Sequence, residues 1–521
     1  MGFLIAYVFN LSPCSGDEMF ETIGLAIIHF EGLNTNRVSK CNQNWHQESK
    51  QVAMELIQKV SQGLWELENC DTVNSVVVLG KEYPPVPEQR QEERHENGVN
   101  MFQHIFTRQG RWNEEFLADV HTRLHFTYRT RFVPIPRHPN GPSPMSISVM
   151  LRDNPLNVIE NVLNNPDCFQ TDIGWGCMIR TGQSLLANAL QRACLGRDFR
   201  IDDNAANEHE LRIIKWFEDD PKYPFSLHKF VQEGFSLSGK KPGEWFGPSA
   251  TSRSIQALVA KFPACGIAHC VISTDSGDVY MDEVEPLFRA DPSAAVLLLL
   301  CVRLGVDVVN EVYWEHIRHI LSSEHSVGIA GGRPSSSLYF FGYQDEHLFY
   351  LDPHKPQLNL ASYQQDLDLF RSVHTQRFNK VHMSDIDPSM LIGILLNGKD
   401  DWQLWQQHIA SSQIIHLSDS KPVDLMLDHQ LESAILGDRY LSEDGQGPSS
   451  KVDTGDYIDV GSFVPCTDSS CKINESEDEY QDVKCKNQRI VVVGETTTNG
   501  SPEVEVEKVL VEKETIPVRS K

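Results

Sequence analysis

Residues 171–180 read TDIGWGCMIR and place one cysteine, Cys177, where a loop gives way to a helix. Apolar residues follow at helical spacing over 185–193, and Gly196 stands where a helix would be capped. Cys177 is therefore predicted at a helix N-terminus. There, unpaired N–H groups and the helix dipole lower the pKa of a thiol and populate its thiolate. A buried structural thiol is the alternative, and this stretch alone does not exclude it.

The loop before Cys177 is built from small and aromatic residues. Gly174 and Gly176 would let the backbone come close to whatever the sulfur attacks. Trp175 would form a wall of the site. A nucleophile also needs a base, which has to come from elsewhere in the chain.

Residues 338–351 contain two aromatic runs that predict a β-hairpin, and Asp352 and His354 follow its second strand. Residues two apart in an extended chain share a face, and Pro353 stiffens the step between them. An imidazole at this place could take the proton of Cys177 while the carboxylate orients the ring and stabilises its cation. The two stretches together predict nucleophilic catalysis by cysteine.

With these motifs the sequence resembles the autophagins, autophagy-related cysteine proteases with a papain-like fold, and most resembles fungal, yeast-like members. The motifs that carry the resemblance are residues 171–184, 328–334 and 350–354, with FTYR at 126–129, WFGP at 245–248 and RLG at 303–305. The resemblance extends over residues 54–415. The order Cys, Asp, His differs from the order Cys, His, Asn of papain.

The resemblance implies a role for each matching residue. Carried over by position, Cys177 is the nucleophile, His354 the base and Asp352 its orienting partner. Tyr128 matches the tyrosine whose hydroxyl binds the oxyanion together with the Cys177 N–H. Without the resemblance, Tyr128 would be interpreted as a core aromatic residue.

Further residues match the part of the family that receives the substrate. Trp245 matches a tryptophan that covers the cleft, although a core position is the plain alternative. Leu304 matches a leucine beside the slot for the substrate tail. The mobile loop that lifts to admit this tail is matched by Gly331, Gly332, Arg333 and Pro334.

The resemblance implies a cysteine endopeptidase acting on a ubiquitin-like autophagy modifier, autophagy-related protein 8 or a GABARAP-like protein. Such an enzyme cuts after the C-terminal glycine, which matures the precursor and later releases the modifier from phosphatidylethanolamine. The alternatives are a catalytically weak modifier-binding scaffold or, less favoured, a thiolesterase or acyltransferase with a similar triad. We expect a cytoplasmic monomer that is recruited to autophagosomal assembly sites, with the nucleus as a further compartment.

Composition narrows the set of partners. The net charge of −26 over 521 residues disfavours nucleic acid and anionic membrane surfaces, so we expect membrane contact only through a lipidated substrate. The 12 cysteines are scattered without disulfide-framework spacing, which favours a reducing compartment. No four-ligand zinc pattern is present, and we predict neither a metal nor a cofactor.

The predicted fold class is α+β, a papain-like protease fold with a small accessory lobe and disordered terminal extensions. The protease domain is predicted over residues 54–420, with an insertion at 136–168 and an irregular accessory segment at 271–291. Residues 1–53 are interpreted as disordered or as a mis-called start. Asp387, Pro388 and Ser389 carry the N-cap and N1 signals of a helix.

Residues 421–521 are predicted to be an acidic, disordered tail. From Leu441 to the end there are 17 acidic and 9 basic residues with many serines, threonines and glycines. Two segments resemble short modifier-binding motifs, in which an aromatic and an aliphatic residue could fill two pockets while the backbone adds a strand. These pairs are Tyr457 with Val460 and Tyr480 with Val483. An inert tail is the alternative.

Overall fold

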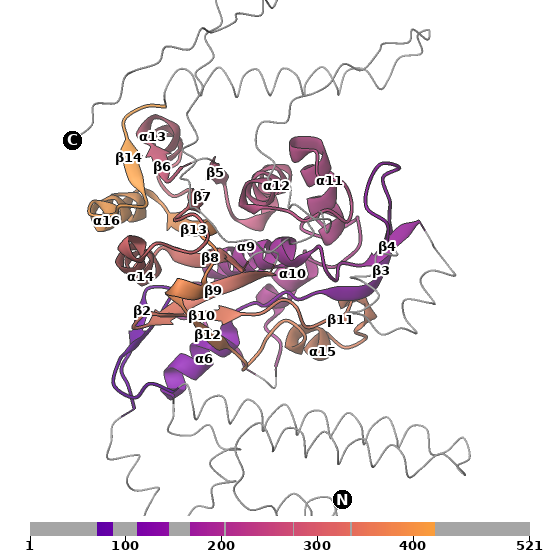
Figure 1. Ribbon diagram of the computed structural model, residues 1–521, viewed down its shortest axis with the longest axis horizontal. Coiled ribbons are helices and arrows are strands. Elements are labelled where there is room, and N and C mark those ends of the chain that lie inside the picture. The colour runs from indigo at the N-terminus through magenta and orange to yellow at the C-terminus, as the bar shows by residue number, and fades with distance from the viewer. Residues whose placement is uncertain are drawn as a thin grey trace, which may run out of the picture. The chain divides into compact units, whose positions relative to one another are not determined.

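The computed structural model describes residues 70–86, 112–144, 167–202, 205–274, 276–333 and 336–421 (Figure 1). The predictions for residues 1–53 lie outside this part of the chain. So do the four tail residues Tyr457, Val460, Tyr480 and Val483, and most of the predicted insertion.

A nine-stranded sheet forms the centre of the described part of the chain. Figure 1 shows its main strands following one another in the order β12-β10-β9-β8-β13-β7-β5. Strand β1 pairs with β9 and β2 pairs with β1, which extends the sheet there. The pairs are antiparallel except that β5 runs parallel to β7. The strands are β1 (Val76–Val78), β2 (Lys81–Tyr83), β5 (His269–Ser273), β7 (Ala295–Arg303), β8 (Ser326–Arg333), β9 (Ser336–Gln344), β10 (His347–Leu351), β12 (Asn379–His382) and β13 (Ser389–Asn397).

The sheet is buried on both faces, because successive residues of its central strands enter two different cores. In β7, Leu297 and Leu299 join the core that contains Leu185. Leu298 and its alternating neighbours join a second core that contains Trp405. Each such leucine contributes about 1.5–3 kcal/mol through burial, which explains why β7 is a continuous apolar run rather than an alternating one.

Helices supply both covering layers. The first core receives α6 (Glu114–Thr122), α9 (Cys177–Leu195), α10 (Glu208–Lys215), α11 (Leu227–Ser238), α12 (Pro248–Lys261) and α15 (Asp366–Arg371). The second core receives α13 (Met281–Ala290), α14 (Trp314–Ser322) and α16 (Lys399–Ile409). The predicted α+β class is confirmed. Of the helices in the described ranges, none combines the length and apolarity needed to cross a lipid bilayer.

The prediction that a helix begins at residues 387–389 is wrong. Ser389–Asn397 is strand β13, which pairs along its whole length with β7 and also with β8. Its apolar run fits a strand buried from both sides, and the local cap signals do not outweigh that pairing. Gly398, with φ +100°, ends the strand, and α16 begins at Lys399.

The prediction that residues 271–291 are irregular is also wrong. Residues 271–273 belong to β5, an edge strand of the main sheet. After them, β6 (Asp278–Tyr280) leads into α13 and pairs in parallel with β14 (His416–Ser418). The β6–β14 pair therefore forms a small sheet that is separate from the main sheet.

A three-stranded sheet in the order β11-β3-β4 brings the predicted site residues together. Its strands are β3 (Arg129–Pro136), β4 (Cys168–Thr171) and β11 (Gln357–Leu358). Tyr128 precedes β3, the loop to Cys177 follows β4, and His354 lies shortly before β11. The predicted insertion joins β3 to β4, and its ends are direct partners, with Pro136 opposite Cys168.

Candidate active site

Helix α9 begins at Cys177, and the preceding loop is folded back on Asp172. The N–H groups of Trp175 and Gly176 donate to the Asp172 carbonyl oxygen at 3.2 and 2.8 Å. Gly174 adopts φ +89°, which favours glycine, whereas a Cβ on Gly176 would lie 2.5 Å from Asp172 Oδ2. The two glycines therefore shape the turn itself. The sequence had suggested instead that these glycines let the backbone come close to a substrate.

A fully buried ion network fixes this loop to the helix. Arg180 Nε lies 2.7 Å from Asp172 Oδ2, and Arg180 Nη1 lies 2.8 Å from Asp219 Oδ1. Burial disfavours charge on Arg180, but the two carboxylates outweigh it and raise the Arg180 pKa. Asp172 Oδ1 also accepts from the Arg129 N–H at 2.7 Å, which ties in β3. Sequence reasoning missed this network, although Asp172 and Arg180 both stand in the opening stretch.

The predicted base and its partner lie in direct contact. His354 Nδ1 is 2.5 Å from Asp352 Oδ1, which also accepts from the His354 backbone N–H at 2.9 Å. Burial on its own would lower the His354 pKa, but the hydrogen bonds to Asp352 and Cys177 raise it to about 9. Burial on its own would raise the Asp352 pKa. The contacts with His354 outweigh burial and lower the Asp352 pKa. At neutral pH the imidazole is therefore cationic and the carboxylate is ionised.

The thiol of Cys177 is buried among hydrogen-bond donors. Burial raises its pKa, but donors from the His354 imidazole, the Ser337 N–H and the Trp245 indole outweigh burial and lower it. Trp245 Nε1 lies 3.3 Å from Cys177 Sγ. The lowered Cys177 pKa and the raised His354 pKa both favour a thiolate–imidazolium pair at the first turn of a helix, and the thiolate is the reactive form of cysteine.

Tyr128 lies beside this pair. Its ring meets the His354 ring edge-on at 5.3 Å, and its hydroxyl hydrogen-bonds with the Cys177 side chain and the Gly174 backbone. Burial and the neighbouring Cys177 charge raise the Tyr128 pKa, so the hydroxyl stays protonated. A neutral donor next to the sulfur suits the stabilisation of an oxyanion.

Two tryptophans near the sulfur have different positions. Trp245 keeps 40% of its surface exposed while its indole contacts the sulfur, which fits the predicted cover of the cleft. Trp175 is buried, packs against Phe169 and donates from its indole to the Thr171 carbonyl at 3.1 Å. Trp175 therefore anchors the loop in the core, and the prediction that it forms a wall of the site is wrong.

The β8–β9 hairpin lies against both members of the pair. Gly332 pairs with Ser337 across the hairpin, and Ser337 donates its N–H to Cys177. Ser336 Oγ lies 3.3 Å from His354 Nε2. Gly331 is paired with Leu338, Arg333 ends β8, and Pro334 lies outside the described residues. The two serines follow the predicted loop motif after one intervening residue, yet no sequence signal assigned them to the site.

Leu304 lies in the second core, directly after β7. It is only 4% exposed, and its N–H donates to the Pro388 carbonyl at 2.9 Å. Cys177 instead forms a small cluster with Tyr128 and Ile173. The described contacts thus do not join Leu304 to the sulfur, and its place beside a substrate slot stays a prediction.

His125 was not expected to contribute to the site. Its Nε2 lies 2.9 Å from the Asp352 carbonyl oxygen, and burial lowers its pKa to about 4. A neutral His125 therefore donates to the backbone of the turn that carries Asp352. Tyr128 supports the same turn, because its N–H donates to the Pro353 carbonyl at 2.8 Å.

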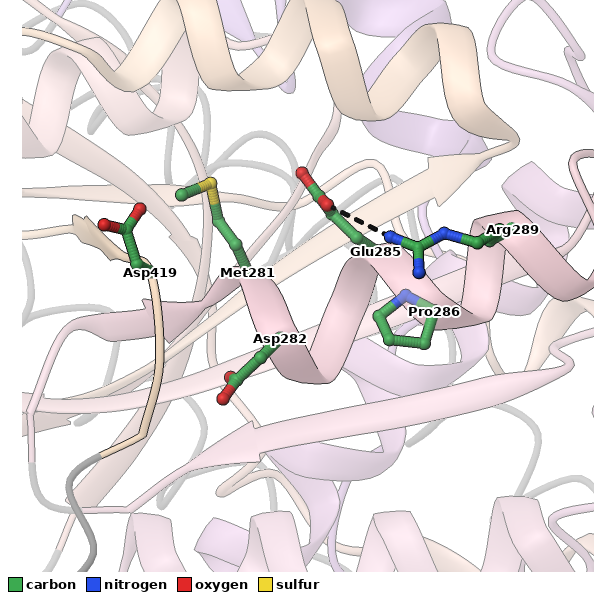
Figure 2. A pocket seen from close by; sticks show the side chains of 6 residues that line it. All are labelled: Met281, Asp282, Glu285, Pro286, Arg289 and Asp419. Carbon is green, nitrogen blue, oxygen red and sulfur yellow. Dashed lines mark ion pairs between the residues drawn. The ribbon is translucent and has the colours of Figure 1, made fainter.

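A separate surface hollow opens beside α13 (Figure 2). Glu285 and Arg289 form an ion pair of 3.6 Å there. The hollow is lined by Met281, Asp282, Glu285, Pro286, Arg289 and Asp419. None of the predicted site residues lines it.

Comparison with known proteins gives a family for this arrangement. The peptidase C54 catalytic domain matches residues 113–408. A probable cysteine protease ATG4 of Kluyveromyces lactis is 48% identical over 462 residues, which cover 88% of this chain and 99% of the relative. The cysteine protease ATG4 of Saccharomyces cerevisiae is 46% identical over 496 residues, which cover 92% of this chain and 99% of the relative. The chain therefore belongs to the peptidase C54 family of papain-like cysteine peptidases.

Proposed function

We propose that this cysteine peptidase of the autophagy pathway cleaves a ubiquitin-like modifier after its C-terminal glycine. The same cut would mature a precursor and release the modifier from phosphatidylethanolamine. Family membership supports the pathway and the type of enzyme. The observation that carries the chemistry is the hydrogen bond between Cys177, at the start of α9, and His354, whose ring is held by Asp352.

In the proposed reaction, the Cys177 thiolate attacks the carbonyl carbon of the terminal glycine. The tetrahedral oxyanion accepts hydrogen bonds from the Cys177 N–H and the Tyr128 hydroxyl. His354 gives its proton to the leaving amine, and the C–N bond breaks to leave a thioester. Water then attacks the thioester while His354 takes one of its protons, and the C–S bond breaks to return the Cys177 thiolate. The product acid releases its remaining proton to solvent as it leaves. Asp352 keeps the ring oriented and stabilises its cation throughout.

The contacts of the sulfur support a preference for glycine. The Trp245 indole and the Ser337 N–H both hydrogen-bond with it, and Tyr128 lies on a further side. A side chain larger than hydrogen next to the scissile bond would meet these groups. The Trp245 ring and the end of the β8–β9 hairpin have to move apart before a substrate tail enters.

The remaining expectations form part of the same proposal. The enzyme would act as a cytoplasmic monomer that is recruited to autophagosomal assembly sites, with the nucleus as a further compartment. It would meet membranes only through the lipidated substrate. The tail motifs at Tyr457 and Tyr480 would tether the modifier. The scaffold alternative is disfavoured, because a charged catalytic pair is costly to keep without a use.

The direct test is cleavage of a GABARAP-like precursor that carries a C-terminal extension, with mass spectrometry of the products. Wild type should cut after the terminal glycine, and Cys177→Ala should not cut at all. A second reaction would use the modifier linked to phosphatidylethanolamine in vesicles, with release into solution as the readout. Modifier binding without cleavage in either assay would favour the scaffold.

A further inference from the structure

The Asp172 side chain joins the two segments that carry the proposed oxyanion donors. One segment is the turn into α9, which presents the Cys177 N–H. The other is the start of β3, where Tyr128 directly precedes Arg129. Asp172 is fully buried, and its carboxylate bonds to α9 through Arg180 and to β3 through the Arg129 N–H. Its contacts therefore bear on both donors at once.

On the helix side, Asp172 and Arg180 hold the peptide group that precedes α9. Asp172 Oδ2 lies 2.7 Å from Arg180 Nε, and the Arg180 N–H donates to the Gly176 carbonyl at 2.9 Å. The Gly176 N–H donates to the Asp172 carbonyl at 2.8 Å. The Gly176 carbonyl and the Cys177 N–H belong to one planar peptide group, so holding the carbonyl also fixes the direction of the N–H.

On the strand side, Asp172 holds the peptide group that follows Tyr128. Asp172 Oδ1 accepts from the Arg129 N–H at 2.7 Å, and the Asp172 N–H donates to the Arg129 carbonyl at 3.4 Å. The Tyr128 carbonyl, in the same peptide group as the Arg129 N–H, accepts from the Gln357 N–H at 2.9 Å. The backbone from which the Tyr128 hydroxyl reaches Cys177 is therefore held from two sides.

The carboxylate suits this double task because each of its oxygens serves a different donor. Both partner residues, Arg129 and Arg180, are fully buried. A carboxylate accepts at two oxygens, whereas the amide of asparagine accepts at one and donates from its nitrogen. An amide at residue 172 would therefore place its nitrogen against the Arg129 N–H or against the Arg180 guanidinium, and one of the two links would be lost.

We propose that Asp172 is a positioning residue that sets the Tyr128 hydroxyl and the Cys177 N–H at the spacing needed to bind the oxyanion. This inference rests on the proposed function, because it assigns Asp172 a part in the same acyl transfer. The oxyanion develops only during attack on a carbonyl. Asp172 therefore controls kcat for amide cleavage and leaves the reactivity of the Cys177 thiolate unchanged.

The test separates carbonyl chemistry from thiolate chemistry. For a peptide whose C-terminal glycine is linked to aminocoumarin, Asp172→Asn should lower kcat roughly tenfold to a hundredfold with little change in KM, because a displaced donor stabilises the oxyanion less. Alkylation of Cys177 by iodoacetamide should keep the wild-type rate, since it displaces iodide from a saturated carbon and forms no oxyanion. An alkylation rate that falls as far as kcat would overturn the proposal.

Asp119→Asn is the matched control for the loss of a buried charge. Asp119 on α6 is also fully buried, and its Oδ1 lies 3.1 Å from Arg123 Nη2. This variant should lose stability in urea unfolding, as Asp172→Asn does, and should keep the wild-type kcat. Equal falls of kcat in the two variants would overturn the proposal, because a general loss of stability would then explain both.

A double-mutant cycle asks whether Asp172 acts through the oxyanion donors. Tyr128→Phe removes the hydroxyl itself. Adding Asp172→Asn to Tyr128→Phe should therefore lower kcat much less than Asp172→Asn does alone, because no hydroxyl remains to be positioned. Additive effects would show that Asp172 does not act through Tyr128 and would overturn the proposal.

A second variant keeps the proposal testable if Asp172→Asn does not fold. Gln357→Pro leaves the buried ion network intact and removes the N–H that holds the Tyr128 carbonyl. It should lower kcat with unchanged alkylation, and an unchanged kcat would contradict control of catalysis by this peptide group. Wild type that cleaves the glycine peptide but not a modifier precursor would overturn the proposed function alone, because the role of Asp172 is measured on the peptide.

Discussion

At the scale of single residues, the charge state of the catalytic pair predicts the pH profile. His354 has its pKa raised to about 9, so it stays protonated below that pH and loses its proton as the pH rises through it. Activity should therefore fall on the alkaline side near pH 9, and on the acid side where the Cys177 thiolate is protonated. The measurement is kcat/KM against pH, with the rate of iodoacetamide alkylation as a second readout.

Asp352→Asn should shift the alkaline limb of the pH profile, the fall of kcat/KM at high pH, to lower pH. Without the carboxylate, the His354 pKa returns toward its ordinary value of about 6.5, and kcat should fall by roughly two to four orders of magnitude. An alkaline limb that stays near pH 9 in this variant would show that Asp352 does not control the His354 charge.

His125 offers a sharper residue-scale prediction, because its effect acts through another group. His125→Phe removes the N–H that donates to the Asp352 carbonyl at 2.9 Å. The loosened turn should lower kcat about tenfold, since losing one hydrogen bond costs on the order of 1–1.5 kcal/mol, and should shift the alkaline limb downward. His125→Gln keeps an N–H donor and should restore the limb. If the Phe and Gln variants lose activity at the same alkaline pH, His125 acts through packing alone.

At the scale of elements, Gly176 is the residue on which the start of α9 depends. A methyl group at Gly176 would lie 2.5 Å from Asp172 Oδ2, inside the buried network with Arg180. Gly176→Ala should therefore destabilise the protein by roughly 2–4 kcal/mol in urea unfolding. Gly174→Ala is the matched comparison, because its φ of +89° is strained but no atom lies within 4 Å of the added Cβ. A smaller loss for Gly176 than for Gly174 would contradict the crowding argument.

A buried carboxyl between α9 and α10 links stability to pH. Burial raises the Glu210 pKa from 4.5 to about 7, beside Gln191 and 3.6 Å from His374 Nε2. Because the folded state raises the Glu210 pKa, this group makes a contribution to folding stability that is fully present below pH 4.5 and is lost as the pH rises through 7. Stability should therefore fall between those values.

Glu210→Gln should remove this loss, because its amide oxygen can still accept from Gln191 and the amide carries no charge at any pH. The variant should be more stable than wild type by about 1–3 kcal/mol at pH 8 and similar at pH 5, measured by urea unfolding. Glu208→Gln, exposed on the same helix, is the control. Equal stability of wild type and Glu210→Gln at pH 8 would show that Glu210 is not a source of the pH dependence.

Sequence predicted those elements whose signal is local. The helix at Cys177 and the strand over residues 294–302 have long, clear apolar patterns, and the hairpin ending at Asp352 has two aromatic runs. Strand β13 was mistaken for the start of a helix, because a short apolar run fits either state until its partners β7 and β8 are known. The parallel pairing of β5 with β7 could likewise not be predicted from the residues of β5 alone.

At the scale of the whole molecule, the residues that position the catalytic pair come from distant parts of the chain. Asp172, Arg180 and Asp219 meet in one buried network, and His125 reaches the Asp352 backbone. No spacing rule predicts such contacts, because they form only when the sheets bring these segments together. Sequence therefore identified the residues that resemble catalytic ones and missed those that hold them in place.

The acidic tail gives a prediction that concerns the entire chain. Deleting residues 441–521 should weaken modifier binding about tenfold if the motifs at Tyr457 and Tyr480 act as a tether. Alkylation of Cys177 and cleavage of a short peptide should be unaffected. Unchanged modifier affinity by fluorescence titration would show that the tail is inert toward the modifier.

The pairing of Pro136 with Cys168 has a consequence for how this protein can change over time. The segment between them departs from and returns to adjacent points, so its length imposes no demand on the strands that carry the chemistry. Insertions, deletions and substitutions should therefore be tolerated in this segment, and a fluorescent reporter can be inserted there. The enzyme thus contains a segment whose sequence and length can change while the strands that lead to the catalytic residues keep their pairing.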